Sequence, residues 1–274
     1  YDVIVVGGGP AGCMAAYAAA KENVSVLLVE KDREIVSPVR FAEAVGKDGL
    51  EKILDTEIDP GWIAATIKKF QFVAPDGTVI YPQVPMTGYV LHRKLFDFDL
   101  GALASKSGAQ IVTKTSAVKL SKEEDSISGV SVRSNGKDYH IKCKIVIGAD
   151  GVESRVARWA GIDTTIQMED METCAQMTLA NLNVADDTCV FYFSQKKFPG
   201  GYGWVFPKGN NLANVGLGIS GDKARSESAF SRLEEFIRTE FPEASILNKT
   251  IGGVPCGNRL PRITSDGILL VGDA

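Results

Sequence analysis

The stretch that decides the fold is Tyr1-Asp-Val-Ile-Val-Val-Gly7-Gly8-Gly9-Pro10-Ala11-Gly12, followed by Cys-Met-Ala-Ala-Tyr-Ala-Ala-Ala. It reads as an apolar strand, a glycine-rich turn and a helix of small residues. A second apolar strand follows from Val24 and ends in an acid, Glu30. This order of strand, GxGxxG turn, helix and acid-ended strand is typical of a dinucleotide-binding βαβ unit.

The three glycines of that pattern and the acid each have a physical task. Gly7 allows the tight turn, Gly9 lets the backbone approach a pyrophosphate, and Gly12 lets the helix pack closely on the strand. The helix N-terminus offers N–H groups and a partial positive charge to the phosphates. Glu30 is expected to accept hydrogen bonds from a ribose diol.

A second GxGxxG match, Gly216-Leu-Gly218-Ile-Ser-Gly221, has a different context. A polar stretch follows it, and no acid-ended strand comes next. We interpret it as a strand that runs into a loop, so the sequence predicts one dinucleotide site and not two.

The composition bounds the class of protein. The chain has 274 residues, 45% hydrophobic and 23% charged, with a net charge of −4, which gives no reason to expect nucleic acid binding. No apolar run reaches the roughly 18 residues of a membrane span. The five cysteines lack metal-like spacing, so we expect reduced thiols, no metal site and a cytoplasmic protein. Because the chain starts and stops beside predicted core strands, we expect it to be part of a longer protein.

Further elements follow from patterns of apolar residues and turns. We expect a helix from Arg93 to Ser107, an amphipathic helix from Glu227 to Phe241, and four short strands between about 171 and 220. A loop or helix start at 38–46 should lead into a helix that runs through Leu54. The remaining expected strands are a hairpin over Lys69–Tyr81, Gln110–Leu120, Ile127–Arg133, a strand after the Asn135-Gly136 turn, Ile145–Gly148 and Ile268–Val271.

Two further motifs each follow a buried strand. Gly148-Ala-Asp150-Gly151 precedes a helix, where Asp150 can bond backbone N–H groups or a cofactor hydroxyl and Ser154 could cap the helix. The second is Gly272-Asp273-Ala274.

Together with the opening pattern, these motifs resemble the FAD-binding motifs of the flavoprotein hydroxylase-like superfamily. The resemblance implies that Asp273 contacts the flavin ribityl chain. It also implies that Arg93 lies at the FAD and that Val118 offers backbone groups to the adenine.

Two segments narrow the family. They are Ser37-Pro-Val-Arg40-Phe41-Ala42-Glu43-Ala44 and Pro199-Gly-Gly-Tyr202-Gly-Trp204-Val-Phe206-Pro207-Lys208. The second resembles the YxWxFP signature of the geranylgeranyl reductase family, FAD enzymes that saturate isoprenoid chains. The resemblance implies that the first segment contacts FAD, through Arg40, Phe41, Ala42 and Ala44. Family members commonly carry Cys at the position of Phe41. The match covers nearly the whole chain, but the C-terminal part of the family is absent here.

The residues of the second segment alternate along a strand. Tyr202, Trp204 and Phe206 therefore share one face, because strand side chains alternate with a period of two. This face would form an aromatic wall for an isoprenoid substrate; a packed sheet face with no ligand is the alternative.

The expected fold is α/β. A Rossmann-like FAD-binding domain is built from the discontinuous segments 1–68, 90–165 and 256–274, and an inserted antiparallel sheet of 69–89 and 166–255 binds substrate.

The expected function is FAD-dependent reduction of geranylgeranyl chains, with NAD(P)H or a ferredoxin as electron donor and transient peripheral contact with a membrane surface. No catalytic residue is assigned; His92 and His140 are the only histidines. Three alternatives remain: a flavin monooxygenase acting on an aromatic compound, a flavin halogenase, disfavoured because it would carry WxWxIP, and a flavin- or lipid-binding protein without turnover.

Overall fold

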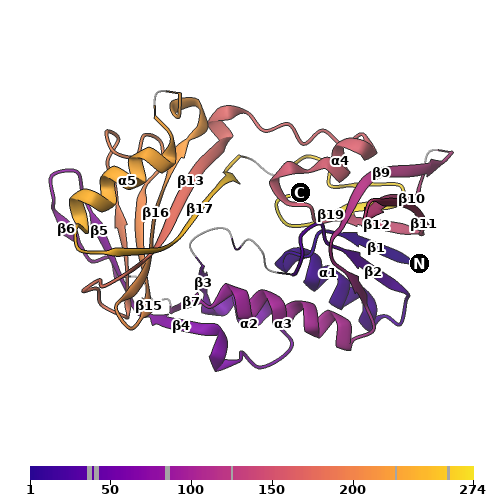
Figure 1. Cartoon of the computed structure of the whole chain (residues 1–274), viewed down its shortest axis with the longest axis horizontal. Coiled ribbons are helices and arrows are strands. Elements are labelled where there is room, and N and C mark those ends of the chain that lie inside the picture. The colour runs from indigo at the N-terminus through magenta and orange to yellow at the C-terminus, as the bar shows by residue number, and fades with distance from the viewer. Residues whose placement is uncertain (36–38, 40–42, 84–86, 125, 226, 258–259) are drawn as a thin grey trace. The chain divides into compact units, whose positions relative to one another are not determined.

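The computed structural model describes residues 1–35, 39, 43–83, 87–124, 126–225, 227–257 and 260–274. The chain divides into two compact units, and each is discontinuous in sequence (Figure 1). The first unit comprises Tyr1–Pro38, Lys94–Thr165 and Asn258–Ala274. The second comprises Val39–Arg93 and Ile166–Gly257.

The first unit is built on a six-stranded sheet with the order β18-β19-β12-β1-β2-β8. Five of these strands are parallel, and only the edge strand β18 is antiparallel. The strands are β1 (Val3–Val6), β2 (Val26–Val29), β8 (Gln110–Val112), β12 (Ile145–Gly148), β18 (Thr264–Ser265) and β19 (Ile268–Leu270). The central strands β1 and β2 are buried along their whole length, as expected for a covered parallel sheet.

Helices and a second sheet cover this parallel sheet. Helix α1 (Pro10–Lys21) packs on β1 and β2 through small residues such as Gly12, Cys13 and Ala16. An antiparallel meander of β9 (Thr115–Glu123), β10 (Ser126–Ser134) and β11 (Lys137–Lys142) shares a core with β1, β2 and α4 (Arg155–Ala160). Helix α3 (Arg93–Lys106), which belongs to this unit from Lys94 onward, and the 3-10 turn Gly151–Glu153 complete the described elements.

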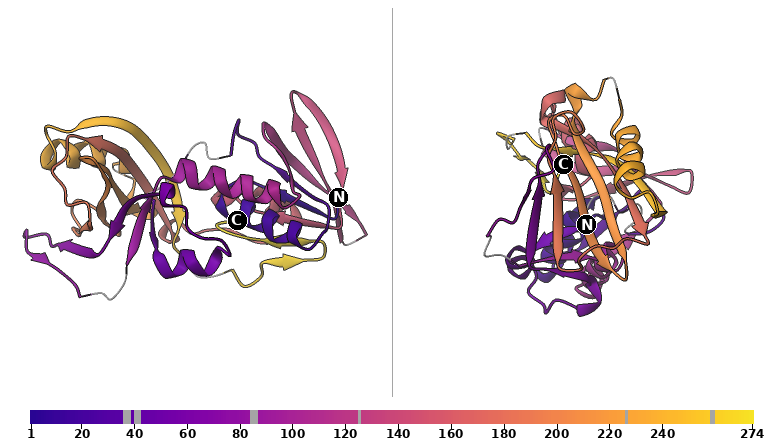
Figure 2. Two further views of the ribbon diagram at one scale, coloured as in Figure 1. Left: turned by 90° about the horizontal axis from the view of Figure 1, so that it is seen from below. Right: turned by 90° about the vertical axis from the view of Figure 1, so that its left-hand side faces the viewer.

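The second unit is built on a seven-stranded sheet with the order β17-β13-β16-β15-β14-β5-β6. Helix α5 (Ala229–Glu240) covers one face, where Leu233 and Phe236 meet Met177 and Leu217 of the sheet (Figure 2). The strands are β5 (Lys69–Val73), β6 (Val79–Ile80), β13 (Met171–Ala180), β14 (Thr188–Tyr192), β15 (Gly203–Gly209), β16 (Leu212–Ser220) and β17 (Ser245–Pro255).

A small antiparallel sheet of β3 (Ala44–Gly46), β7 (Gly88–Leu91) and β4 (Ile63–Ile67) belongs to the same unit. Its residues Ala65, Ile67 and Val90 share a core with Trp204 and Phe206 of β15. The helical elements that remain are α2 (Lys47–Ile53) and 3-10 turns at Pro60–Trp62, Met168–Asp170 and Gly221–Lys223.

The α/β class and the inserted antiparallel sheet are confirmed. So are the β5–β6 hairpin, the two long helices and the Asn135-Gly136 turn, whose residues have φ of 49° and 75°. The second GxGxxG match lies in β16 and continues into a 3-10 turn, so it is a strand and not a dinucleotide turn.

Three details differ from the sequence prediction. Segment 39–68 and residues 90–93 group with the second unit, because β3, β7 and β4 pair with one another and pack on β15. The predicted strand Gln110–Leu120 is two strands, since Lys114 has a φ of 51° and the chain passes there from one sheet to the other. Strands β3, β4, β7, β17 and β18 were not expected, and β3 occupies residues 44–46, where the sequence predicted a loop or the start of a helix.

No helix in the described part of the chain is both long and apolar enough to span a membrane.

Candidate functional site

The motifs found in the sequence converge at the carboxyl ends of the parallel strands. Gly7 follows β1, Glu30 follows β2, Ala149 and Asp150 follow β12, and the Gly272-Asp273 turn comes two residues after β19. Ligands of open parallel sheets bind at this edge, so the topology gathers the predicted cofactor residues where a dinucleotide would lie.

Two glycines of the first turn are required by close backbone contacts. A Cβ on Gly7, which has a φ of +108°, would lie 2.2 Å from the carbonyl oxygen of Ala149. A Cβ on Gly12 would lie 1.9 Å from the carbonyl oxygen of Gly7. These contacts fold the turn tightly enough to bring β12 and the start of α1 against it.

Gly9 differs, because a Cβ there would meet no protein atom within 4 Å. It is the N-cap of α1, in an extended conformation, and no side chain caps the helix at this end. The first-turn N–H groups and the helix dipole are therefore available to an anion, and the open space fits the pyrophosphate of FAD.

Glu30 is buried, with 8% of its surface exposed. Its carboxylate accepts hydrogen bonds from the backbone N–H of Gly8 at 2.6 Å and of Asp32 at 2.8 Å. The carboxylate is thereby fixed beside the glycine turn, and each oxygen keeps lone pairs for a ribose hydroxyl.

Asp150 caps helix α4 in place of Ser154. The backbone N–H of Val156 donates to Asp150 Oδ2 at 3.0 Å, whereas Ser154 occupies the N-cap position with a φ of 43° and makes no side-chain cap. Asp150 Oδ1 and Ser154 Oγ are buried without a hydrogen-bond partner among the described residues. Asp150 thus retains the acceptor capacity that a cofactor hydroxyl would need.

Gly272 has a φ of +71°, and a Cβ on it would lie 2.8 Å from the Cβ of Ala11 in the first turn of α1. The Gly272-Asp273 turn is therefore in contact with the helix N-terminus, and Asp273 is exposed there. The first and third motifs are 260 residues apart in the chain and adjacent in space.

The structure gives Val118 an unusual backbone position. Between β9 and β10 the register passes from Ala117 opposite Val132 to Lys119 opposite Ser131, so no residue of β10 lies opposite Val118. A β-bulge of this kind leaves a residue out of the ladder, which makes its backbone groups available to a ligand.

For the other predicted cofactor residues that it describes, the structure gives the element and the burial. Arg93 is half-buried at the start of α3, and Ala44 begins β3 of the second unit. Arg40, Phe41 and Ala42 lie outside the described residues.

The predicted aromatic wall lies on the sheet face opposite α5. Trp204 and Phe206 are each 5% exposed, whereas Tyr202 is half-buried. The face contains more rings than the sequence predicted: pairs of ring centroids 5.3 to 6.3 Å apart connect Phe70, Phe72, Phe191, Phe193, Tyr202, Trp204 and Phe206. The additional rings come from β5, β14 and the residue that follows β14.

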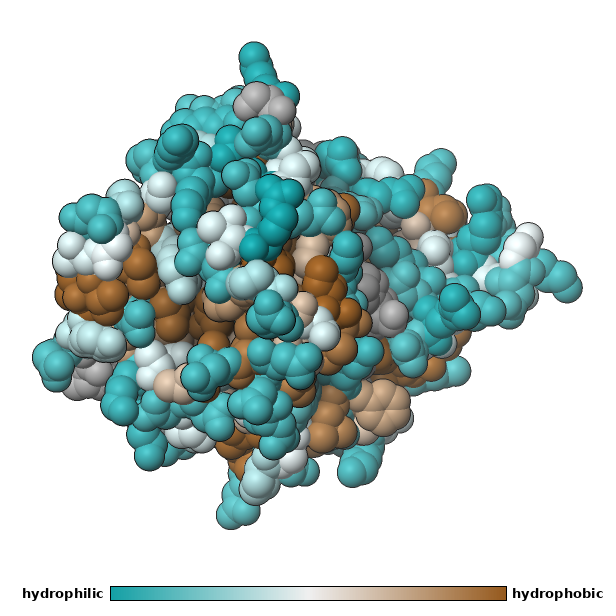
Figure 3. Space-filling view, turned by 60° about the vertical axis from the view of Figure 1, so that its left-hand side comes forward, coloured by the Kyte–Doolittle hydropathy of each residue, from teal (hydrophilic) through white to brown (hydrophobic). Residues whose placement is uncertain are grey.

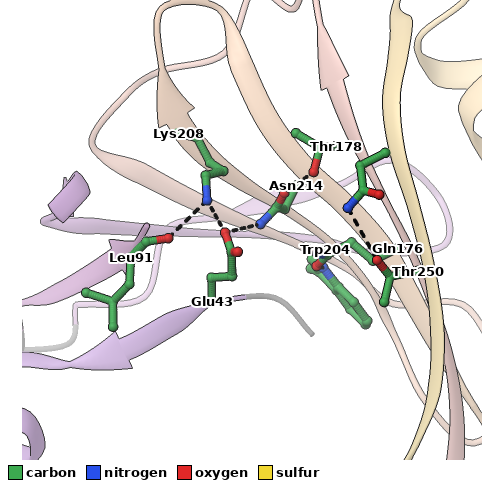
Figure 4. A network of polar contacts seen from close by, with 9 residues as sticks. Glu43, Leu91, Gln176, Thr178, Trp204, Lys208, Asn214 and Thr250 are labelled. Carbon is green, nitrogen blue, oxygen red and sulfur yellow. Dashed lines mark hydrogen bonds and ion pairs between the residues drawn. The ribbon is translucent and has the colours of Figure 1, made fainter. Parts of the chain in front are cut away.

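Two neighbours fix the indole of Trp204 (Figure 4). Its Nε1 donates to Gln176 Oε1 of β13 at 3.2 Å. A Cβ on Gly216 of β16 would lie 2.4 Å from Cζ2 of the ring, so the indole occupies the space of the missing side chain. The Gly216-x-Gly218 pair therefore has a packing role in the wall.

A buried polar network closes one end of this face (Figure 4). Glu43 Oε2 accepts from Lys208 Nζ and, at 2.8 Å, from Asn214 Nδ2. Lys208 Nζ also donates to the carbonyl of Leu91 at 3.0 Å, and Thr178 Oγ1 donates to Asn214 Oδ1 at 2.8 Å. Glu43 and Lys208 both lie in the segments quoted from the sequence, but no spacing signal connects residues 165 positions apart.

The two histidines occupy different units. His92 is exposed, and partial burial together with the charge of Lys208 lowers its pKa, an effect that Glu43 opposes. His140 is exposed on β11 of the first unit, with Nδ1 3.3 Å from Ser121 Oγ.

Comparison with known proteins gives two family-model matches. Residues 2–35 match the FAD dependent oxidoreductase model, and residues 170–254 match the geranylgeranyl reductase catalytic domain. The first match contains the glycine turn and Glu30, and the second contains the strands of the aromatic wall that follow β13.

Close relatives cover the whole chain. A digeranylgeranylglycerophospholipid reductase of Methanocella arvoryzae is 45% identical over 278 residues, which span 100% of this chain and 70% of the relative. A second relative with that name, from Methanococcoides burtonii, is 46% identical over 100% of this chain and 68% of its own length.

Solved structures agree with these relatives. A geranylgeranyl bacteriochlorophyll reductase-like protein of Thermoplasma acidophilum has a TM-score of 0.93 and 36% identity, covering 100% of this chain and 70% of that one. A triple mutant of a flavin-dependent brominase, with a TM-score of 0.81 and 16% identity over 100% of this chain and 72% of that one, shares the fold. On the strength of its relatives, its matched segments and its fold, the chain belongs to the geranylgeranyl reductase family of FAD-dependent oxidoreductases.

Proposed function

We propose that this protein is an FAD-dependent reductase that saturates the double bonds of geranylgeranyl chains carried by membrane lipids. The observation that carries the proposal is the aromatic sheet face around Tyr202, Trp204 and Phe206, in the segment that matches the geranylgeranyl reductase catalytic domain. The names of the most similar relatives support the same substrate class.

The first unit would hold the cofactor at its carboxyl edge. Gly9 and the N-terminus of α1 would receive the pyrophosphate, and Glu30 the ribose. Asp273 would hold the ribityl and phosphate region together with Arg93, the first residue of α3, and the bulge at Val118 would offer backbone groups to the adenine. When bound, reduced FAD supplies a hydride.

The second unit would bind the isoprenoid chain. An isolated trisubstituted alkene has no carbonyl to polarise, so its reduction depends on exact placement and on the exclusion of water. An aromatic face favours both, because its rings bury apolar surface and the indole N–H of Trp204 is already bonded to Gln176.

The electrons come from outside the chain. Gly216 and Gly218 lie inside β16, so the second glycine pattern provides no second dinucleotide turn. NAD(P)H binding transiently and a ferredoxin are the two donors that fit, and comparing flavin reduction by each under anaerobic conditions distinguishes them.

Contact with a membrane surface would bring the substrate to the aromatic face. The second unit exposes Val79, Ile80 and Tyr81 at its β6 edge and Phe193 beside β14, with exposed fractions of 41 to 59%. Brown apolar surface appears between polar residues on the face that Figure 3 draws. Sedimentation with lipid vesicles tests this contact, and a protein that stays in the supernatant would contradict it.

The function itself is tested by product analysis of the complete protein. With a geranylgeranyl lipid and a chemical reductant, the lipid should gain two hydrogens per double bond, and the reaction should not need oxygen. Incorporation of oxygen into an aromatic compound, with no change in the lipid, would favour a monooxygenase instead.

A further inference from the structure

One carboxyl on the aromatic face has no structural task. Glu172 lies on β13, and Cys174 and Gln176 follow it on the same side because strand residues alternate. A Cβ on Gly218, in the neighbouring strand β16, would lie 2.6 Å from Glu172 Oε2 and 3.2 Å from Cys174 Sγ. The carboxyl therefore occupies the space above Gly218.

Tyr202 lies at the same place in the sheet. Its carbonyl accepts from the backbone N–H of Gly218 at 3.0 Å, so Tyr202, the residue before β15, continues the row of Cys174 and Gly218. The ring of Tyr202 lies 5.7 Å from that of Phe191 and 6.0 Å from that of Trp204. Burial, and after it the charge of nearby Glu172, raise the pKa of Tyr202.

Other partly or fully buried glutamates are bonded. Glu30 accepts two backbone N–H groups, and Glu43 accepts from Lys208 and Asn214. The carboxyl of Glu172 makes no hydrogen bond or ion pair to any residue that the structure describes, while its backbone pairs with Ser220 and Val254 in the sheet. Burial raises its pKa, which favours the neutral acid that a proton donor must be.

We propose that Glu172 is the catalytic acid that protonates the isoprenoid double bond. This assignment rests on the proposed function. The O–H bond of Glu172 breaks as a C–H bond forms at one alkene carbon, and the π bond breaks. The other carbon receives the hydride that reduced FAD supplies, so the alkene is reduced and the flavin is oxidised. The half-buried carboxylate is then reprotonated by water.

The titratable groups near Glu172 are weaker acids. Cys174, on the same strand, has its pKa raised to about 12, chiefly by burial. Tyr202, which precedes β15, also has a raised pKa, and the charge of Cys256, which follows β17, contributes to the raised pKa of both groups. A carboxylic acid transfers its proton more readily than a thiol or a phenol with such a pKa.

The test compares three variants of the complete protein, each purified with FAD. Glu172→Gln removes the acid and keeps the shape, Glu172→Asp keeps the acid, and Glu169→Gln changes an exposed carboxyl three residues away. We measure anaerobic reoxidation of the reduced flavin by a geranylgeranyl lipid in a single turnover. Glu172→Gln should slow it by about 10²–10⁴-fold, Glu172→Asp should recover part of the rate, and Glu169→Gln should leave it unchanged.

Two readouts separate proton donation from a structural role. Binding of the lipid to the oxidised protein should be the same in Glu172→Gln as in wild type. Oxidised wild type should show the infrared band of a protonated carboxyl above the pH at which an exposed glutamate ionises. This band should be missing from Glu172→Gln. Because the acid form is the donor, the wild-type rate should fall as pH rises through the pKa of Glu172.

The outcomes are distinct. If Glu172→Gln reoxidises on the lipid at the wild-type rate, the assignment of Glu172 is overturned and the proposed function is not. If Glu172→Gln does not fold, a wild-type rate that is independent of pH, with no protonated-carboxyl band, would overturn it as well. A wild type that never reoxidises on the lipid would overturn the proposed function, and the assignment with it.

Discussion

Gly9 is the glycine of the first turn that the protein's own packing does not require. A Cβ on it meets no atom within 4 Å, whereas a Cβ on Gly12 would lie 1.9 Å from the Gly7 carbonyl. We therefore predict that Gly9→Val folds with nearly wild-type stability and is colourless, because its side chain fills the space for the pyrophosphate.

The matched control is Gly12→Ala. This variant should have a lower thermal stability than wild type, while the protein that still folds should keep its bound flavin. Absorbance of bound flavin per protein and thermal unfolding measure the two effects. Yellow Gly9→Val protein with normal FAD content would show that the pyrophosphate lies elsewhere.

A second prediction concerns the contribution of Asp273 and Arg93 to FAD binding. If they hold the ribityl and phosphate region, Asp273→Ala and Arg93→Ala should each weaken FAD binding by about 1–3 kcal/mol, the cost of leaving a polar partner unpaired. Titration of the apoprotein with FAD measures this. Unchanged affinity in both variants would mean that the superfamily pattern misplaces the cofactor in this chain.

The sequence allowed single residues to be predicted where a local pattern demands them. The tasks of Gly7 and Gly12 follow from a strand, a turn and a helix that are adjacent in the chain, and close backbone contacts confirm them. The pairing of Glu43 with Lys208 was not predictable, because its partners are 165 residues apart and neither segment signals the other. No sequence motif surrounds Glu172. Its position on the aromatic face is seen only in the structure, where its carboxyl fills the space that a side chain at Gly218 would take.

Among the elements, β16 shows how a glycine pattern can serve packing. Gly216 leaves room for the indole of Trp204, and a Cβ there would lie 2.4 Å from the ring and 2.7 Å from the Ala175 carbonyl. Gly216→Ala should destabilise the protein by about 1–3 kcal/mol through overpacking and should change the tryptophan circular dichroism.

Gly49 in α2 is the control for that variant, since a Cβ there meets nothing within 4 Å. Gly49→Ala should be neutral or slightly stabilising. Chemical denaturation compares the two, and equal stability of Gly216→Ala and wild type would contradict the packing of the indole on Gly216.

The ion pair of Glu43 and Lys208 joins the segment before β3 to strand β15. The two side chains are only 11% and 12% exposed. Lys208→Met should cost about 3–5 kcal/mol, because it leaves a buried carboxylate without its partner. Adding Glu43→Gln should recover part of the loss.

Lys197→Met provides the comparison, because Lys197 pairs with Glu240 at the surface, with side chains 53% and 33% exposed. It should cost no more than about 1 kcal/mol. A similarly small cost for Lys208→Met, measured by denaturation in a double-mutant cycle, would contradict a stabilising role for the buried network.

Helices and strands with a clear spacing of apolar residues, or with marked turn residues, were predicted. Elements without such a pattern were not. The helices at Arg93 and Ala229 and the β5–β6 hairpin carry apolar spacing or turn residues that mark them. Strand β17 was missed because it is an edge strand whose residues are mostly exposed or half-buried, so no apolar run identifies it. The break at Lys114 depends on the passage of the chain between two sheets, which is a tertiary effect.

At the scale of the whole molecule, the order of motifs predicted the α/β class and the inserted sheet. The boundary within residues 39–93 was wrong, because the small sheet of β3, β7 and β4 packs on β15, more than a hundred residues later. Such a contact is decided by the folded core and leaves no trace in local spacing.

The central claim is that the reduced flavin of this protein delivers its electrons to an isoprenoid double bond. The measurement is a single-turnover experiment on the complete protein, photoreduced without oxygen and mixed with a geranylgeranyl lipid while flavin absorbance is recorded. The account predicts that oxidised FAD reappears without oxygen, with one double bond saturated for each flavin oxidised. Flavin that stays reduced with the lipid, and reoxidises only when oxygen is admitted, would contradict it.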